Sequence, residues 1–198
     1  NTAYPGERNT TDAHRRTMIK HGWSKLFDVD ILDAEGPDLE LPIPNGKRIQ
    51  KNLVGKDIKN YDSMLVLSHF KGHPMGGFGG ALKQLSIGCA SSAGKANIHG
   101  AGKPEEMWTT EQNAFLESMA DAAESVVKLF DGKIVYINVM KNMSVDCDCC
   151  AVAEDPCMKD IGILASLDPI AIDQACLDLV YASDDPGRDL SLIHISEP

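Results

Sequence analysis

The chain carries little positive charge for its size: its 198 residues include 19 Lys and Arg against 29 Asp and Glu, which gives a net charge of −10. A protein that binds nucleic acid through its phosphates needs the opposite balance, so this composition argues against such a binder. The chain has no apolar run of about eighteen residues, so no transmembrane helix is expected, and no signal peptide is recognisable. Internal repeats and low-complexity tracts are also absent. The 43% of hydrophobic residues suffices for a core, and the length predicts one domain.

The two ends of the chain do not resemble natural ends. Asn1 is not an initiator Met, so we expect the chain to be cut at its start. Residues 190–198 match the translation of a common sequencing adaptor, and such scars are kept out of fold reasoning. We therefore expect residues 1–189 to form a single α/β domain that is a fragment of a larger one, and residues 190–198 to be non-native.

Hydrophobic periodicity predicts an alternation of strands and helices. The expected helices cover residues 11–21, 48–60, 80–89, 110–130 and 170–181, and the expected strands cover residues 27–32, 63–68, 133–139 and 160–166. This order predicts an α/β fold, a mostly parallel sheet with flanking helices. Ligands bind beyond the carboxyl ends of parallel strands, so we expect the segments after Ser68 and after Val139 to meet at one edge of the sheet.

One segment concentrates reactive side chains and glycines. Residues 68–99 hold three of the six His, three Lys and seven Gly, directly after the apolar run 64–67. Glycine lets the backbone approach a ligand closely, while His and Lys supply proton transfer, metal ligation and amine chemistry. A purely structural loop needs no such density, so the sequence predicts a functional site here.

Within this segment, His69 and His73, together with Lys83, are candidate catalytic residues. Gly72 and Pro74 argue against a helix, but a loop can still aim both rings at one point. The alternative is two loop histidines that are satisfied by backbone carbonyls.

A glycine cluster precedes the helix expected at 80–89 and is a candidate cofactor site. Its members are Gly76, Gly77, Gly79 and Gly80. Free N–H groups at a helix start attract an anion, although the pattern is neither a Walker A nor a Rossmann fingerprint, and a plain tight turn is the alternative. Lys83 lies one turn into the helix, where the dipole favours a nucleophilic amine, and Lys95 follows. Both lysines join the candidate cofactor-binding residues, with a solvated surface lysine as the alternative.

The cysteines are unevenly placed. They are Cys89, Cys147, Cys149, Cys150, Cys157 and Cys176. Four of them crowd into eleven residues, which suggests reduced thiols in a cytoplasmic protein rather than a secreted disulfide scaffold. Cys147 and Cys149 are candidate metal ligands, although the spacing matches neither a zinc site nor a ferredoxin run. A redox thiol pair and plain structural thiols are the alternatives, and Cys89 and Cys176 are expected in the core.

Three aspartates recur along the last expected helix. Asp168 precedes Pro169 and is predicted to be the N-cap. Asp173 and Asp178 are five residues apart and do not share a helix face well, so solvation is expected for both.

Several long motifs resemble those of domain-of-unknown-function family 362. They cover residues 1–8 with His14, residues 68–84, residues 88–95 with His99, residues 147–149 and residues 160–175. The resemblance spans nearly all of residues 1–189 and implies an iron–sulfur-centre protein. Many members carry a ferredoxin-like insert after the position of His99. Here Gly100 to Trp108 contains no Cys, so the chain has no ferredoxin-type cluster motif.

A more distant likeness concerns three residues. His73, Lys83 and His99 are ten and then sixteen residues apart, which is similar to lactate-racemase-type enzymes that use a nickel-pincer nucleotide. The likeness implies that Lys83 tethers the cofactor, His99 ligates the metal and His73 moves protons. For the second acid–base histidine of that family, only His14 and His69 are available.

These observations predict a metal- or cofactor-dependent enzyme of anaerobic metabolism that acts on a small molecule, racemase-like, isomerase-like or a redox metalloenzyme. Its cofactor is expected to be an iron–sulfur cluster or a nickel-type group. The alternative is an iron–sulfur or thiol-based electron-transfer protein with an electron-transfer partner and no turnover. A third hypothesis is an anion-binding module. The enzyme requires His73, Lys83 and His99 to converge, whereas a cluster carrier requires the thiols to converge.

Overall fold

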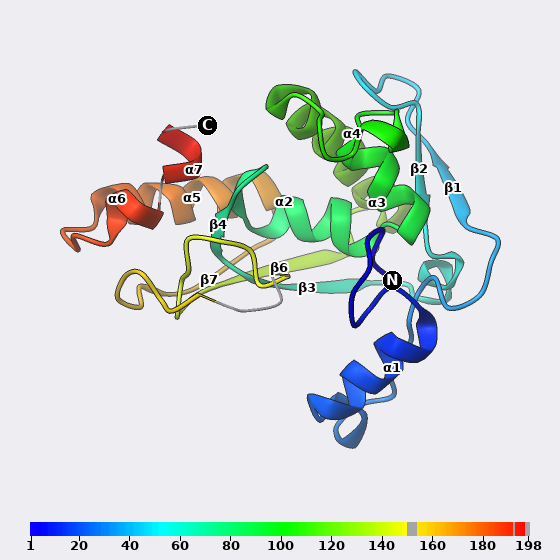
Figure 1. The fold of residues 1–198 in the computed structure, drawn as a ribbon, viewed down its shortest axis with the longest axis horizontal. Helices are drawn as coiled ribbons and strands as arrows, with labels where there is room; N and C mark the ends of the chain where they lie inside the picture. Colours follow the sequence, from blue (N-terminus) through cyan, green and yellow to red (C-terminus); the bar gives the residue numbers. More distant parts are fainter. Residues whose placement is uncertain (150–153, 192, 197–198) are drawn as a thin grey trace.

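The computed structural model describes residues 1–149, 154–191 and 193–196 (Figure 1). In chain order its elements are α1 (Thr11–Lys20), η1 (Trp23–Lys25), β1 (Leu39–Pro42), β2 (Lys51–Val54), η2 (Lys56–Asn60), β3 (Met64–His69), β4 (Lys71–His73), β5 (Gly77–Gly79), α2 (Ala81–Lys83), η3 (Gln84–Gly88), α3 (Ser92–His99), η4 (Pro104–Glu106), α4 (Gln112–Phe130), β6 (Ile134–Met140), β7 (Gly162–Ser166), α5 (Pro169–Ala182), α6 (Arg188–Ser191) and α7 (Ile193–Ser196). The α/β prediction is confirmed.

The central sheet has the strand order β3–β6–β7. β3 and β6 are parallel, in a register that runs from Met64↔Ile134 to His69↔Val139. β6 and β7 are antiparallel, as are the hairpins β1–β2 and β4–β5. The prediction of a mostly parallel sheet is therefore wrong. A parallel neighbour needs a crossover connection, whereas the described parts of the segment between β6 and β7 contain no helix, and the chain returns beside β6 in the opposite direction.

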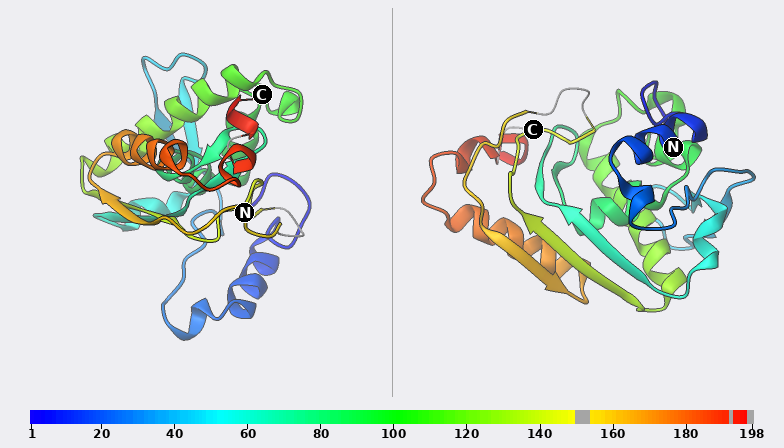
Figure 2. Two further views of the ribbon diagram at one scale, coloured as in Figure 1. Left: turned by 90° about the vertical axis from the view of Figure 1, so that its left-hand side faces the viewer. Right: turned by 90° about the horizontal axis from the view of Figure 1, so that it is seen from below.

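Helices cover one face of this sheet. α2, α4 and α5 pack on the same side, while α1 and η1 project from the opposite side (Figures 1 and 2). The predicted apolar stripe of α4 is buried: Phe115, Met119, Ala122, Val126 and Phe130. It contributes to a core that also includes Val66 and Tyr136 from the strands. On the other face of β3, Leu65 and Leu67 are 56% and 57% exposed, so this strand is buried on one side only.

Two predicted elements are wrong. Residues 27–32 form no strand, and the predicted helix over residues 48–60 is instead β2 followed by η2. The short stretch around Leu53 pairs with β1, and this tertiary pairing overrides the local preference. The helix at Pro169–Ala182 is confirmed, with the Asp168 side chain accepting hydrogen bonds from the N–H groups of Ile170 and Ala171.

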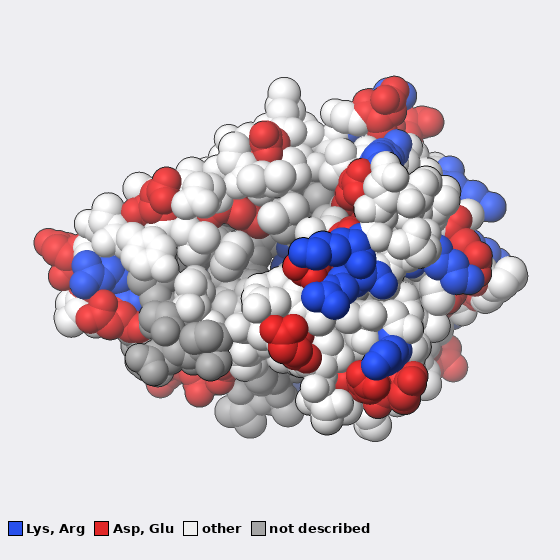
Figure 3. Space-filling model, turned by 90° about the horizontal axis from the view of Figure 1, so that it is seen from above, with Lys and Arg blue, Asp and Glu red and all other residues white. Residues whose placement is uncertain are grey.

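The surface above the helices carries mixed charge. Lys and Arg side chains lie among Asp and Glu side chains across this face, and much of it is uncharged (Figure 3). Among the described residues, no helix combines the length and apolarity needed to cross a membrane. The expectation that residues 190–198 are non-native stays a prediction. In the structure Ile195 of α7 approaches Gly77 of β5.

Candidate functional site

The segments that follow β3 and β6 lie against each other, as predicted. The Gly72 N–H donates to the Ser144 carbonyl at 2.9 Å. A Cβ at Gly72 would lie 1.8 Å from the Val145 carbonyl oxygen, so only glycine permits this approach. The close approach brings Cys147 beside the β4–β5 hairpin.

The sulfur of Cys147 is the point where several side chains converge. Lys83 Nζ lies 3.6 Å from Cys147 Sγ. His73 and Cys149 act on the same sulfur, because both lower the pKa of Cys147. Cys147 itself is only 6% exposed. The donors come from β4, from α2 and from the cysteine loop, which are far apart in the sequence.

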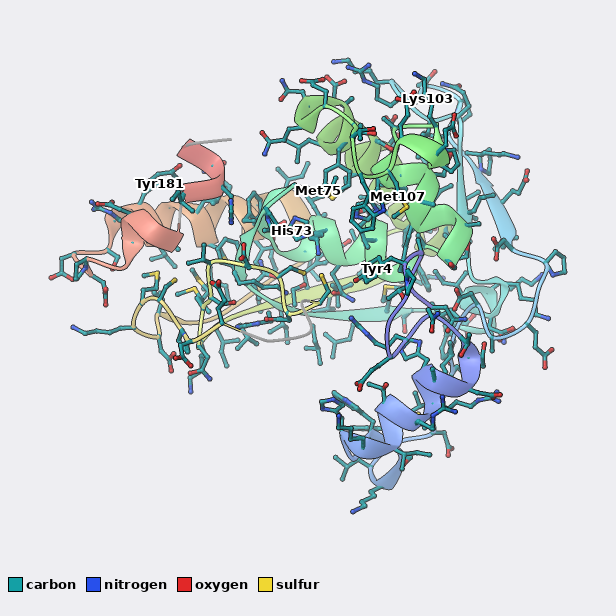
Figure 4. The ribbon with its side chains drawn as sticks, in the orientation of Figure 1. Tyr4, His73, Met75, Lys103, Met107 and Tyr181 are labelled. Atoms are coloured by element: carbon teal, nitrogen blue, oxygen red, sulfur yellow. The ribbon has the colours of Figure 1, made fainter. Side chains whose placement is uncertain are left out.

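Backbone contacts fix the orientation of His73. Its Nδ1 accepts hydrogen bonds from the N–H groups of Met75, at 3.2 Å, and Gly76, at 2.9 Å. The ring proton must therefore be on Nε2, which leaves Nε2–H to donate to Cys147. Burial lowers the pKa of His73, so the ring is neutral at physiological pH. Figure 4 shows His73 pointing into the interior next to Met75.

These neighbours favour the thiolate form of Cys147. The hydrogen bond from the Cys149 thiol lowers the pKa of Cys147 most; burial opposes the shift, and His73 and the charge of Lys83 add to it. The same hydrogen bond raises the pKa of Cys149, because its proton is held by the thiolate. Burial and a hydrogen bond to Cys149 raise the pKa of Tyr4 to about 12. Tyr4 therefore belongs to the surroundings of the Cys147–Cys149 pair.

Asp173 holds the backbone that presents Lys83. Its carboxylate accepts hydrogen bonds from the Ala81 N–H at 2.7 Å and the Leu82 N–H at 3.0 Å. A Cβ at Gly80 would lie 2.3 Å from the same carboxylate. The expectation that Asp173 is solvated is wrong, because it is 2% exposed and faces the sheet. Part of the N–H set predicted for an anion is therefore bound to this carboxylate. The remaining glycines form the β4–β5 hairpin, and their cofactor role stays a prediction.

Lys83 also lies where the helix changes its winding. α2 ends at Lys83, and the π-helical turn η3 begins at the next residue. Such turns often occur at functional sites.

His99 is a second imidazole close to this centre. Its Nδ1 donates to the Lys95 carbonyl oxygen at 2.7 Å, and its ring stacks on Phe115 with a centroid distance of 4.8 Å. Burial lowers the pKa of His99 to about 4, although the hydrogen bond to Lys95 opposes the shift. Within the described part of the chain, Nε2 of His99 has no hydrogen-bond partner, so it carries an available lone pair.

The structure does not bring His69 to the Cys147 sulfur. Its Nδ1 lies 2.8 Å from Asp148 Oδ2, and its Nε2 lies 2.8 Å from the Lys141 carbonyl oxygen. The hydrogen bond to Asp148 raises the pKa of His69, so both nitrogens act as donors. Lys71 Nζ lies 3.0 Å from the same Asp148 oxygen. Burial disfavours the charged carboxylate, but these partners outweigh it and lower the pKa of Asp148 to about 2.

Lys95 lies in a different environment from Lys83. Its ammonium group donates to the Ala90 carbonyl, and burial lowers its pKa. The charge of Asp33 opposes this shift, and Asp33 lines a cleft of about 420 Å³ with Ser92 and Asp38. The charges of Asp33 and Lys95 also act on His14, so this histidine belongs to that environment rather than to the Cys147 centre. A cofactor role for Lys95 stays a prediction.

A metal centre is not evident in the described residues, where no three His, Cys, Asp or Glu side chains are arranged to hold a metal ion. The predicted ligands His99, Cys147 and Cys149 therefore stay predictions, as does the iron–sulfur or nickel-type cofactor. Cys150 lies outside the described residues, and Cys157 Sγ donates to the Met143 carbonyl at 3.2 Å. Cys89 and Cys176 are buried, as predicted.

Sequence reasoning missed two groups at the site. Tyr4 was part of a recognised motif, but nothing in its local pattern places it beside Cys149. Asp148 lies between Cys147 and Cys149 in the sequence. Its partners His69 and Lys71 are far away along the chain, and no local pattern identifies them.

Comparison with known proteins identifies a family for this chain. A family model described as Domain of unknown function (DUF362) matches residues 2–178 of the chain. No curated protein matches the chain, and no solved structure does.

Proposed function

Because the chain belongs to the family described as Domain of unknown function (DUF362), a description that names no activity, we propose its function from the site: it is an enzyme that transfers a proton on a small molecule, with the Cys147 thiolate as its central reactive group. The observation that carries this proposal is the convergence of Lys83, His73 and Cys149 on one sulfur. Reduced thiols at the centre suit the cytoplasm, which is part of the proposal.

The roles of Lys83 and His73 follow from where the negative charge lies before and after the proton transfer. A thiolate that takes a proton from a substrate carbon loses its negative charge, and the charge passes to the substrate. Lys83, which lies 3.6 Å from the sulfur, balances the charge before the transfer and remains close to it afterwards. His73 supplies a fixed Nε2–H donor at the same point.

His99 supplies a second proton acceptor. Its Nε2 lone pair is available, and its low pKa keeps the ring neutral. A racemase or isomerase requires two acid–base groups, because one removes a proton and the other returns one, and His99 is the second group in this proposal. The described residues offer no three-ligand set for a metal, so no step of this proposal passes through one.

Hydrogen exchange in heavy water tests the proposal. The reduced protein is incubated with small carboxylic acids that carry a hydroxyl, keto or amino group next to the carboxylate, and deuterium uptake at carbon is followed by mass spectrometry. We expect uptake that falls by about 100-fold or more in Cys147→Ser and is retained in Cys150→Ser. Equal uptake in the wild type and Cys147→Ser would reject the proposal.

A second candidate is electron transfer through the thiols without turnover. What favours it is the mutual influence of Cys149 and Cys147, each of which shifts the pKa of the other. It predicts no deuterium uptake from any of the acids, together with stoichiometric oxidation of the protein by an external acceptor.

A further inference from the structure

One face of the central sheet is apolar and open to solvent. Its side chains alternate with the buried ones of the core, and the pairing of β3, β6 and β7 places them in adjacent rows. The most exposed large members on the three strands are Leu65, Leu67, Val135 and Ile163, at 56%, 57%, 42% and 63%. Contiguous exposed apolar side chains of this kind mark an interaction surface.

A second apolar surface stands on the same side of the sheet. α1 and η1 project from the face that carries Leu67 (Figures 1 and 2). In the described structure neither of them buries a residue, and Trp23, Leu26 and Phe27 are 53%, 74% and 62% exposed. We call residues 11–29 the arm. A helix of 10 residues without a buried side chain is only marginally stable in water, so the arm needs a surface to pack on.

The charge of the arm indicates what that surface belongs to. Residues 11–25 carry four basic side chains against the single acidic side chain of Asp12. The four are Arg15, Arg16, Lys20 and Lys25. The whole chain has the opposite balance, with 19 Lys and Arg against 29 Asp and Glu. The positive arm is therefore attracted to an acidic protein, and a second copy of this chain offers both that charge and an exposed apolar face.

We propose that two copies of the chain form a symmetric dimer in which the arm of each copy packs across the apolar face of β3, β6 and β7 of the other. About a two-fold axis each contact occurs twice, so both arms and both faces are buried together. A membrane surface would also attract a basic segment with exposed apolar side chains, but it would leave the sheet face open. The dimer is independent of the chemistry proposed for Cys147.

Sedimentation equilibrium over a wide range of protein concentration measures the association. Leu26→Glu places a charge on the arm, and Leu67→Glu places one on the sheet face. Both side chains are more than half exposed, so neither replacement should disturb the fold, which circular dichroism checks. Tyr181→Glu is the matched control, because Tyr181 is 51% exposed on α5, on the helical side of the sheet (Figure 4).

Cross-linking shows which surfaces meet. The photoreactive residue p-benzoylphenylalanine replaces Leu26, and equal amounts of isotopically labelled and unlabelled protein are mixed before irradiation. Peptide mass spectrometry then separates cross-links between two copies from those within one copy.

We expect a monomer–dimer equilibrium for the wild type and for Tyr181→Glu, with the dissociation constant raised by about tenfold or more in Leu26→Glu and in Leu67→Glu. Cross-links from position 26 should reach β3, β6 or β7 of the other copy. A wild type that stays monomeric at every concentration would overturn the inference. So would a dissociation constant that either glutamate leaves unchanged, or cross-links that stay within one copy or reach other surfaces.

Discussion

His69 and Asp148 are joined by a 2.8 Å contact between Nδ1 and Oδ2, although 79 residues separate them in the sequence. Lys71 Nζ reaches the same oxygen at 3.0 Å. Asp148 lies between the two cysteines of the site, so these contacts hold the middle of the loop while Cys147 meets Lys83 and His73. The position of the reactive sulfur thus depends on an ion pair that takes no part in the chemistry.

Asp148→Asn should weaken this anchor. The variant loses the charge that pairs with His69 and Lys71, but both His69 and Asp148 are partly exposed, so solvent screening limits the effect. We expect the free energy of unfolding to fall by about 1 kcal/mol in urea titrations. Asp184→Asn is the control, because Asp184 is exposed and has no ion pair in the described structure. Equal stabilities of the two variants would show that the contact contributes nothing.

The stability contributed by this pair should depend on pH in a defined window. The pKa of His69 is raised above 6.5, so its contribution is complete below that value and is lost as the pH rises through the raised pKa. The pKa of Asp148 is lowered to about 2, so its contribution is complete above 3.8 and is lost as the pH falls through about 2. The free-energy difference between the wild type and His69→Gln should therefore be largest at mildly acidic pH and shrink toward alkaline pH. A free-energy difference that stays constant from mildly acidic to alkaline pH would contradict the pairing of His69 with Asp148.

Asp173→Ala should be far more damaging than Asp178→Ala on the same helix. Asp173 is buried and accepts hydrogen bonds from Ala81, Leu82 and Asn138. Replacement by Ala would leave these three donors without an acceptor. We expect a loss of about 3 kcal/mol in the free energy of unfolding, measured in urea. Asp178 is exposed, so its replacement should cost less than about 0.5 kcal/mol. Similar losses for the two variants would mean that Asp173 does not support α2.

Gly72→Ala should displace the cysteine loop. The added methyl group would lie 1.8 Å from the Val145 carbonyl oxygen, a distance at which backbone must move. We expect a loss of about 2 kcal/mol or more in the free energy of unfolding and faster alkylation of Cys147, because the loop separates from its donors. Gly6→Ala is the control, since nothing lies within 4 Å of a methyl group there. Unchanged alkylation kinetics in Gly72→Ala would show that the close approach is not required.

Much of the helical structure could be predicted, because the residues that specify a helix are close together in the sequence. The stripe from Phe115 to Phe130 and the Asp168-Pro169 cap are signals within one turn or a few turns of chain. Strands depend on their neighbours, and this is where prediction failed. Residues 27–32 alternate between apolar and polar side chains as a strand does, but in the described structure they pair with no strand. Residues 51–54, by contrast, pair with β1.

The direction of β7 could have been inferred. The sequence predicts no helix between residues 140 and 160, and without a crossover the next strand returns antiparallel. The burial of Asp173 could also be predicted, because this residue lies on the same helix face as the buried Cys176 and Val180.

The location of the site could be predicted from the sequence, but the contacts between its side chains could not. The rule that loops after parallel strands meet at one edge brought residues 68–99 and 140–149 together correctly. Which histidine meets which partner depends on side-chain directions in a hairpin. His73 turns to Cys147 and His69 to Asp148, a division that spacing alone does not show.

The most direct test of the central claim is the ultraviolet thiolate absorbance as a function of pH, with the signal of Cys147→Ser subtracted from that of the wild type. We predict that the difference persists well below neutral pH and that its midpoint rises by about one pKa unit in Lys83→Met but not in Lys128→Met. A midpoint at the ordinary thiol value of 9.0, unaffected by Lys83→Met, would contradict the assignment of Cys147 as a thiolate held by Lys83 and its neighbours.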